Sequence, residues 1–175
     1  NANEAISYQY SRYNYNVTDF WQPNLPFATS DHNPEIVGLD LPEPSGATYK
    51  EIQVLGTNDF HGRLLPDGGN AAGAGPFATA VKELRAENPN TIFAAAGDLV
   101  GASTFESFIQ DDNPTIDALN AMGLEVSAAG NHEFDRGYDD FVNRIQDRAD
   151  WEYIAANVEE PAGQPDKLAE TWTKT

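Results

Sequence analysis

Cysteine is absent from this chain of 175 residues, and basic side chains are few. The absence of cysteine excludes disulfide bonds and thiolate-bound zinc. Lysine and arginine number 10 against 28 aspartate and glutamate residues, so the formal net charge at pH 7 is −18. A surface this acidic repels bulk nucleic acid and anionic membranes. An anionic substrate would need local positive charge, which metal ions can supply. The alternative is a well-solvated surface suited to an extracellular or salty environment.

Long hydrophobic runs are also missing, since none approaches the roughly 20 residues of a membrane-spanning helix. We therefore expect no membrane span in this chain. Hydrophobic residues still make up 40% of the sequence, which is enough for a packed core. The length suits one ordinary domain or parts of two. The first residues resemble the middle of a protein rather than its start, and we expect the chain to be a fragment.

The composition changes near residues 42–48, where Pro42, Pro44 and Gly46 have the chemistry of a linker. Before this point the sequence is aromatic and rich in asparagine. Tyrosines at period-two spacing between Tyr8 and Tyr15 predict strands, and Ile36–Leu39 predicts a short final strand. We predict an N-terminal segment at 1–41, a linker at 42–50 and a second domain at 51–175.

The second domain alternates strands and helices. We predict strands at about 51–56, 91–96, 125–129 and 153–156, a glycine-rich loop at 68–75, and helices at about 76–87, 102–109 and 137–149. A further helix has Asn113 as its N-cap, Pro114 in its first turn and Gly123 just past its end. Trp151 and Tyr153 are expected to be buried beside the last strand. The alternation predicts an α/β fold with a mainly parallel sheet and right-handed crossovers.

Side chains suited to metal binding follow three of these predicted strands, at the point where each strand ends. Parallel strands deliver such residues to one carboxyl edge of an open sheet. Each of them alone is consistent with a structural role, as a capped turn or a helix start with a surface histidine. Taken together, three strand ends favour a metal site. The residues concerned are Asp59, His61, Asp98, Asn131 and His132.

The residue types fit this chemistry. Asp59 and His61 lie two apart on a segment expected to be extended, so their side chains would share a face and reach one ion. The carboxylate of Asp98 can bridge two cations. Asn131 offers a neutral amide oxygen, which suits Mg²⁺, Mn²⁺ or similar ions. An aspartate three residues after His132, Asp135, can fix the tautomer of that histidine.

Three motifs and one short match carry a resemblance to a known family. Thr57–Gly62, Gly97–Ser103 and Gly130–Asp135, together with Ala156–Val158, resemble the 5′-nucleotidase and 2′,3′-cyclic phosphodiesterase branch of the calcineurin-like metallophosphoesterases. The resemblance covers about residues 51–158. It implies a partial metallophosphoesterase sheet with flanking helices and a site for two divalent ions, with Mn, Mg, Zn, Ca and Fe not distinguished.

The resemblance also implies roles for individual residues. Asp59 and His61 would bind one metal ion, Asp98 would bridge both, and Asn131 would bind the second. His132 would be the catalytic histidine, oriented by Asp135. The family completes its site with two further histidines and a glutamine from later sequence, and this chain holds none of them. We therefore expect weak metal binding and little hydrolysis from the chain alone.

The N-terminal segment carries a second, shorter resemblance. Asp31 and His32, just before the strand at Ile36–Leu39, are similar to the closing motif of the endonuclease/exonuclease/phosphatase fold, also called DNase I-like. Residues 1–41 would then be the tail of a secreted bacterial nuclease domain, with a turn capped by an aspartate as the alternative. The rest of that nuclease site would lie upstream of the chain.

Together these features predict part of a secreted or cell-surface bacterial enzyme that hydrolyses phosphoesters of nucleotides or cyclic nucleotides. Nucleic acid would be a partner only through the upstream nuclease domain. One alternative is a non-catalytic structural or binding module, because an incomplete sheet exposes an edge that can pair with another segment. A further alternative is part of an extracellular nuclease.

Overall fold

The computed structural model describes residues 6–10, 35–39, 50–69, 71–163 and 167–174. Two N-terminal strands, β1 (Ile6–Tyr10) and β2 (Glu35–Leu39), pair antiparallel with Ile6 opposite Leu39. The predicted strand at Ile36–Leu39 is therefore confirmed, and the tyrosine-rich segment forms a strand over Ile6–Tyr10. Two further tyrosines of the predicted strands, Tyr13 and Tyr15, lie outside the described residues, and so do Asp31 and His32 of the nuclease-like motif.

The second sheet has four parallel strands in the order of the sequence. They are β3 (Gln53–Thr57), β4 (Thr91–Ala95), β5 (Val126–Ala128) and β6 (Glu152–Ile154). Each strand is joined to the next by a helical connection, as parallel pairing requires. The predicted α/β fold with a mainly parallel sheet is confirmed, and all four predicted strands are present.

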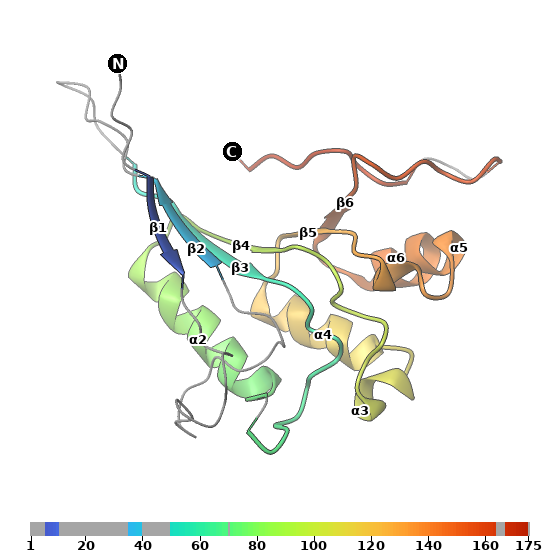
Figure 1. The fold of residues 1–175 in the computed structure, drawn as a ribbon, viewed down its shortest axis with the longest axis horizontal. Helices are drawn as coiled ribbons and strands as arrows, with labels where there is room; N and C mark the ends of the chain where they lie inside the picture. Colours follow the sequence, from blue (N-terminus) through green and yellow to red (C-terminus); the bar gives the residue numbers. More distant parts are fainter. Residues whose placement is uncertain (1–5, 11–34, 40–49, 70, 164–166, 175) are drawn as a thin grey trace.

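Helices connect these strands, and Figure 1 shows α2 (Ala74–Glu87) and α4 (Asn113–Met122) on the same side of the sheet. A short helix, α3 (Phe105–Phe108), precedes α4. The helix predicted at about 137–149 is present, and its middle is π-helical: η2 (Phe141–Ile145) joins α5 (Tyr138–Asp140) to α6 (Gln146–Arg148). A 3.6-residue pattern indicates a helix, but it does not report a turn widened by one residue. None of the described helices has the length and apolar character needed to cross a membrane.

The ends of α4 agree only in part with the prediction. Gly123 is the C-cap at φ 74°, as expected, and its N–H donates to the carbonyl of Asn120. The predicted N-cap, Asn113, is instead the first residue of the helix, and Asp112 takes the cap position at φ 60°. Its side chain makes no capping hydrogen bond, because the Asp112 carboxylate is bonded elsewhere, as described below.

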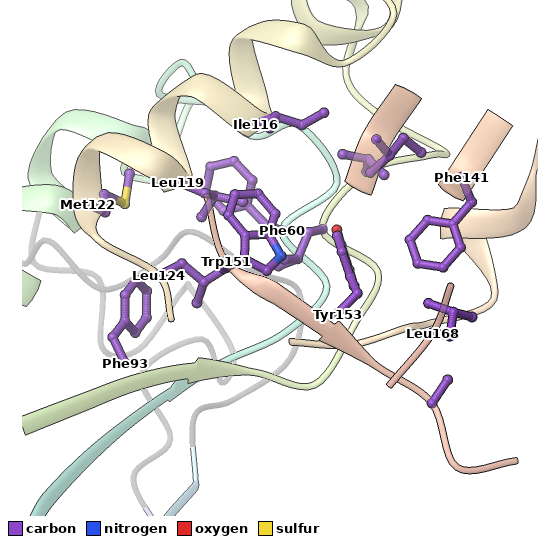
Figure 2. Close-up of a cluster of buried hydrophobic side chains, with 14 of the residues drawn as sticks. Phe60, Phe93, Ile116, Leu119, Met122, Leu124, Phe141, Trp151, Tyr153 and Leu168 are labelled. Carbon is purple, nitrogen blue, oxygen red and sulfur yellow. The ribbon is translucent and has the colours of Figure 1, made fainter. Parts of the chain in front are cut away.

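The hydrophobic core lies between the sheet and the helices (Figure 2). Phe93 on β4 and Leu119 on α4 are buried, as is Phe60 in the loop after β3. Trp151 and Tyr153 are 3% and 0% exposed, so their predicted burial is confirmed. The ring of Tyr153 meets that of Phe141 edge to face, with centroids 4.9 Å apart. Because Phe60 is fully buried directly between Asp59 and His61, the core anchors the loop that carries the predicted ligands.

Candidate metal centre

The loops that follow β3, β4 and β5 remain hydrogen-bonded to each other beyond the strands. The N–H of Asp59 donates to the carbonyl of Gly97 at 3.0 Å, and the N–H of His61 donates to that of Asp98 at 3.2 Å. The N–H of His132 donates to Oδ1 of Asp98 at 2.9 Å. Three strand ends therefore deliver their polar side chains to one place at the carboxyl edge of the sheet, as Asp98 touches both neighbouring loops.

One group of side chains has the geometry of a metal site. His61, Asp98 and His132 each offer a ligand atom, and these three atoms lie within 4.8 Å of one another. All three residues are partly buried, and the imidazole rings of His61 and His132 stand edge to face with centroids 5.0 Å apart. The sequence placed His132 beside the ions as a catalytic group. The structure puts its imidazole within reach of the same ion as His61 and Asp98.

Asp59 lies beside this group, but not for the reason given by the sequence. The segment was expected to be extended, whereas β3 ends at Thr57 and both Asp59 and His61 adopt left-handed backbone conformations, at φ 53° and 46°. The turn nevertheless brings Oδ1 of Asp59 to 3.8 Å from Nε2 of His61, and the side-chain amide of Asn58 donates to the other carboxylate oxygen. The two side chains therefore lie close together, the predicted extended backbone is wrong, and the binding of one ion by both residues stays a prediction.

The orientation of His61 is set by a backbone carbonyl. Its Nδ1 lies 2.8 Å from the carbonyl oxygen of Gly101. A carbonyl oxygen can only accept, so Nδ1 carries a proton, and in the neutral ring Nε2 is the nitrogen that keeps a lone pair. Metal-binding histidines characteristically use the second ring nitrogen in this way, because the bond fixes both tautomer and ring angle. His61 therefore presents Nε2, the nitrogen nearest Asp59, in a form able to bind a cation.

His132 has the carboxylate partner that the sequence predicted for it. Its Nδ1 lies 3.1 Å from both carboxylate oxygens of Asp135. This hydrogen bond raises the pKa of His132 above the ordinary histidine value, since the carboxylate favours the protonated ring. The N–H of Ala102 also donates to Asp135, at 3.2 Å. The roles of His132 and Asp135 in catalysis stay predictions, and so does metal binding by Asn131, an exposed residue next to His132.

Glu133 is a residue of the site that the sequence analysis gave no role. It is 1% exposed, and its carboxylate accepts three backbone hydrogen bonds, from Gly130 at 2.7 Å, Leu99 at 2.8 Å and Asp98 at 2.9 Å. Burial raises the pKa of Glu133, while the three N–H groups oppose that rise. The carboxylate thus ties the loop after β4 to the loop after β5. The sequence signal that could have indicated this role is the position of Glu133, three residues after Gly130 at the end of a strand.

Two glycines allow these loops to approach so closely. A Cβ atom added at Gly97 would lie 2.5 Å from the backbone nitrogen of Gly130. One added at Gly130 would lie 2.5 Å from the backbone nitrogen of Asp98 and closer still to its Oδ1. Gly97 also has φ 93°, which favours glycine. Any larger side chain at either position would push Asp98 away from His132.

The sequence of this site region matches a known family. The profile of the calcineurin-like phosphoesterases aligns with residues 52–170. The chain belongs to this family. The resemblance inferred from the three motifs is therefore confirmed, and the matched residues include every residue of the metal-ligand group. The match begins at residue 52 and so does not test the nuclease-like prediction for residues 1–41.

Three relatives illustrate the range of proteins that carry this phosphoesterase sequence. The chain is 31% identical to the endonuclease YhcR of Bacillus subtilis over 68% of its own length and 11% of that protein. It is 36% identical to the cell wall protein Lmo0130 of Listeria monocytogenes, over 70% of the chain and 20% of the relative. It is 33% identical to a 5′-nucleotidase of Vibrio parahaemolyticus, over 63% and 20% respectively. The phosphoesterase chain thus spans a fifth or less of these relatives.

A solved structure of the family has the same fold. The crystal structure of the calcineurin-like phosphoesterase YfkN from Bacillus subtilis superposes with a TM-score of 0.54 at 26% identity. The aligned part covers 67% of this phosphoesterase chain and 40% of that structure. The arrangement of strands and helices around the site is therefore that of a known metallophosphoesterase.

Proposed function

We propose that this chain contributes part of a metal-dependent site that hydrolyses nucleotides, as a 5′-nucleotidase, a 2′,3′-cyclic nucleotide phosphodiesterase or both. One observation carries the proposal, which is the gathering of His61, Asp98 and His132 within 4.8 Å at the carboxyl edge of the sheet. Membership of the phosphoesterase family and the likeness to a 5′-nucleotidase support the reaction and the substrate class.

The donor set fits divalent cations. It consists of imidazole nitrogens and carboxylate or amide oxygens with no thiolate, which suits Mn²⁺, Mg²⁺, Zn²⁺ or Fe²⁺. Asp59 and His61 would hold one ion, Asp98 both, and Asn131 the second. Two cations held by these residues would supply the charge that orients a phosphate ester and that makes a water more acidic. They would also supply the positive charge that a chain of net charge −18 needs in order to bind a phosphate.

His132 acts on the phosphate in this scheme. Because Asp135 occupies Nδ1, the free nitrogen is Nε2. The hydrogen bond to Asp135 raises the pKa of His132 above the ordinary histidine value, which increases the protonated fraction of the ring at any given pH. A protonated Nε2 can donate to a phosphate oxygen or to the leaving oxygen, a contribution of about 10²–10⁴ in rate. Asp135 keeps the ring in the required orientation.

The wider protein is a secreted or cell-surface bacterial enzyme in this proposal, and a likeness to a cell wall protein supports that location. Residues 1–41 are the tail of a DNase I-like domain that contains Asp31 and His32, residues 42–50 are a linker, and residues 51–175 are the first part of the phosphoesterase domain. The likeness to the endonuclease YhcR favours a second candidate, in which the chain is part of an extracellular nuclease.

Titration calorimetry with Mn²⁺ and a colorimetric assay with bis(p-nitrophenyl) phosphate test the proposed site. The chain offers only three histidines, so we expect weak but measurable Mn²⁺ binding and slow turnover. Asp98→Asn should abolish both, because Asp98 is the residue shared by the two neighbouring loops. Asp117→Asn is a matched control, since Asp117 is exposed on α4 and pairs only with the surface Arg148 among its recorded contacts.

A chain that binds no Mn²⁺ while correctly folded would contradict the proposal and favour a non-catalytic module. Turnover that persists in Asp98→Asn would show that hydrolysis arises elsewhere.

A further inference from the structure

A small polar network is buried beneath the candidate metal centre. Ser107 on α3 and Thr115 on α4 are fully buried, and Asp112 between them is 6% exposed. The hydroxyl of Ser107 donates to Oδ1 of Asp112 at 2.6 Å and lies 2.7 Å from the hydroxyl of Thr115. Burying a carboxylate is costly unless its oxygens are hydrogen-bonded. The buried carboxylate of Asp112 therefore needs a structural reason, and we look for it in the groups to which it is hydrogen-bonded.

Helix capping does not explain Asp112. Aspartate at an N-cap normally accepts from the backbone N–H of the second or third helical residue. Asp112 stands at the N-cap of α4 but makes no such bond. Its second oxygen, Oδ2, accepts instead from the backbone N–H of Gly101 at 3.2 Å. Both carboxylate oxygens therefore point away from the helix that Asp112 begins, toward α3 and toward the loop after β4.

Gly101 connects this carboxylate to the metal centre. Its N–H is bound by Asp112, and its carbonyl accepts from Nδ1 of His61 at 2.8 Å. Gly101 is in turn packed tightly against the loop after β5, because an added Cβ atom would lie 2.7 Å from Oδ2 of Asp135 and 2.9 Å from Cβ of His132. The position of Gly101 therefore determines where Nε2 of His61 points.

The backbone of His61 is held by Thr104, the N-cap of α3. The N–H of Thr104 donates to the carbonyl of His61 at 3.1 Å, and the hydroxyl of Thr104 donates to that of Gly62 at 2.5 Å. Gly62 packs directly on Ser107, where an added Cβ atom would lie 2.5 Å from Cβ of Ser107. The start of α3 therefore holds the backbone of His61, while Asp112 holds Gly101, the partner of the His61 ring.

The backbone around the network is strained. Ala102, Asp111 and Asp112 have φ values of 42°, 55° and 60°, in the left-handed region that residues other than glycine rarely adopt. Such conformations cost about 1–3 kcal/mol each and persist only where surrounding bonds enforce them. The hydrogen bonds of Asp112 to Ser107 and Gly101 can hold these conformations in place, because they connect the two ends of the strained segment.

We propose that Asp112 is a positioning residue for the metal centre, which acts through Gly101 to fix the tautomer and direction of the His61 imidazole. The inference rests on the proposed function as far as the metal ion is concerned. Its structural part, the control of His61 by Asp112, holds for the metal-free chain as well. Asp112 is not one of the candidate metal ligands.

Nitrogen NMR of the metal-free chain tests the structural part directly. In ¹⁵N-histidine-labelled protein, the His61 signals are identified by their loss in His61→Gln. At a pH where the imidazole ring is neutral, the unsubstituted chain should show a protonated Nδ1 and an unprotonated Nε2 for His61. Asp112→Asn replaces one accepting oxygen with an amide NH₂, which cannot accept from Gly101 or Ser107, and should give a mixture of the two tautomers. Asp117→Asn, the same change on the exposed side of α4, should leave the spectrum unchanged.

Calorimetry with Mn²⁺ tests the consequence. Outer partners of metal-binding histidines typically contribute about 10–100-fold to affinity, and Asp112 acts one step further away. We therefore expect Asp112→Asn to weaken Mn²⁺ binding about tenfold and Asp117→Asn to have no effect. An Asp112→Asn chain that folds, keeps the His61 tautomer and binds Mn²⁺ as the original does would overturn the inference.

Ser107→Ala decides the question if Asp112→Asn fails to fold. It removes the donor to Oδ1 of Asp112 together with the partner of the Thr115 hydroxyl, so the carboxylate becomes free to rotate away from Gly101. The same tautomer mixing and an affinity loss of about three- to tenfold are expected from the lost bond to Asp112. Unchanged signals and affinity in folded Ser107→Ala would equally overturn the inference. If the unsubstituted chain binds no Mn²⁺, the proposed function is wrong. The ¹⁵N-histidine spectra of the metal-free chain and its variants then still test the positioning role of Asp112.

Discussion

Residues in left-handed conformations gather at the metal centre and its support. Among the described residues other than glycine, six have positive φ angles: Asp59, His61, Asp98, Ala102, Asp111 and Asp112. Three of them are proposed metal ligands and the other three belong to the segment that holds His61. Strain of this kind typically marks sites where side chains are presented in fixed directions. At this scale the local backbone is the main structural cost of the site.

Ala102→Gly should relieve part of that cost. Ala102 has φ 42°, and this left-handed conformation costs about 1–2 kcal/mol for a residue with a Cβ atom. Glycine removes that cost, but its greater freedom in the unfolded chain lowers the stability by about 0.5–1 kcal/mol. We expect urea denaturation to show a stability gain of up to about 1 kcal/mol. The control Ala121→Gly, in the last turn of α4, should lose up to about 1 kcal/mol. A clear loss in Ala102→Gly would contradict the assigned strain.

Gly130→Ala should damage the site through sterics alone, since no positive φ is recorded for this glycine. Its new Cβ would lie 2.5 Å from the Asp98 nitrogen and overlap Oδ1. We expect about 1–3 kcal/mol of destabilisation and loss of Mn²⁺ binding by calorimetry. Gly56→Ala in β3 is the matched control, because an added Cβ there meets nothing within 4 Å. Equal Mn²⁺ affinity in the two variants would exclude the close contact of Gly130 with Asp98.

At the scale of elements, the 3₁₀ turn η1 (His132–Phe134) works as a connector between two strand ends. It carries His132 toward the metal group on one side and buries Glu133 on the other. The Glu133 carboxylate collects three N–H groups from the loops after β4 and β5. These loops have few other means of satisfying the donors, since β5 is only three residues long.

Glu133→Gln should loosen this connection. The glutamine carbonyl can still accept, but its NH₂ group would face backbone donors, which leaves at least one of them unsatisfied. We expect a loss of about 1–3 kcal/mol in unfolding free energy, measured by thermal or urea denaturation, together with weaker Mn²⁺ binding. Glu83→Gln on the exposed face of α2 should change neither quantity. Unaltered stability in Glu133→Gln would show that the three hydrogen bonds contribute little.

At the scale of the whole molecule, charge is the dominant property. A net charge of −18 disfavours the compact state through self-repulsion. The candidate ligands add to a local concentration of negative charge, because Asp59 and Asp98 lie at the same edge as Asp135 and Glu133. Binding of divalent cations would relieve this repulsion locally, while monovalent salt would screen it everywhere.

Mn²⁺ should therefore stabilise the chain more than salt of equal ionic strength does. A ligand at about 100 times its Kd adds about 2.7 kcal/mol to the unfolding free energy, and this increment should appear as a higher thermal midpoint. Asp98→Asn should lose the increment from Mn²⁺ and keep the smaller gain from NaCl. Asp117→Asn should behave as the original chain. If Mn²⁺ and NaCl raise the thermal midpoint of Asp98→Asn by the same amounts as they raise that of the original chain, Mn²⁺ acts only by screening.

Periodicity predicted most of the elements, because burial on one face imposes a repeat on the sequence. All four parallel strands and the helices α2, α3 and α4 were anticipated. The failures have local causes. The π-helical turn over Phe141–Ile145 depends on which carbonyl each N–H selects. Asp112 rather than Asn113 is the N-cap, and its carboxylate makes no capping bond because it binds Ser107 and Gly101. The expected extended segment at Asp59 and His61 is a left-handed turn.

The sequence by itself determined the family, the α/β class and the residue types available for a metal, since these follow from composition, periodicity and motifs at strand ends. Only the tertiary structure decided that His132 joins His61 and Asp98 in one group, that Glu133 ties two loops together, and that Asp112 reaches Gly101. The reason is physical: these contacts join residues that lie far apart in the sequence, so they depend on how the loops pack, and loop packing leaves no repeat in the sequence.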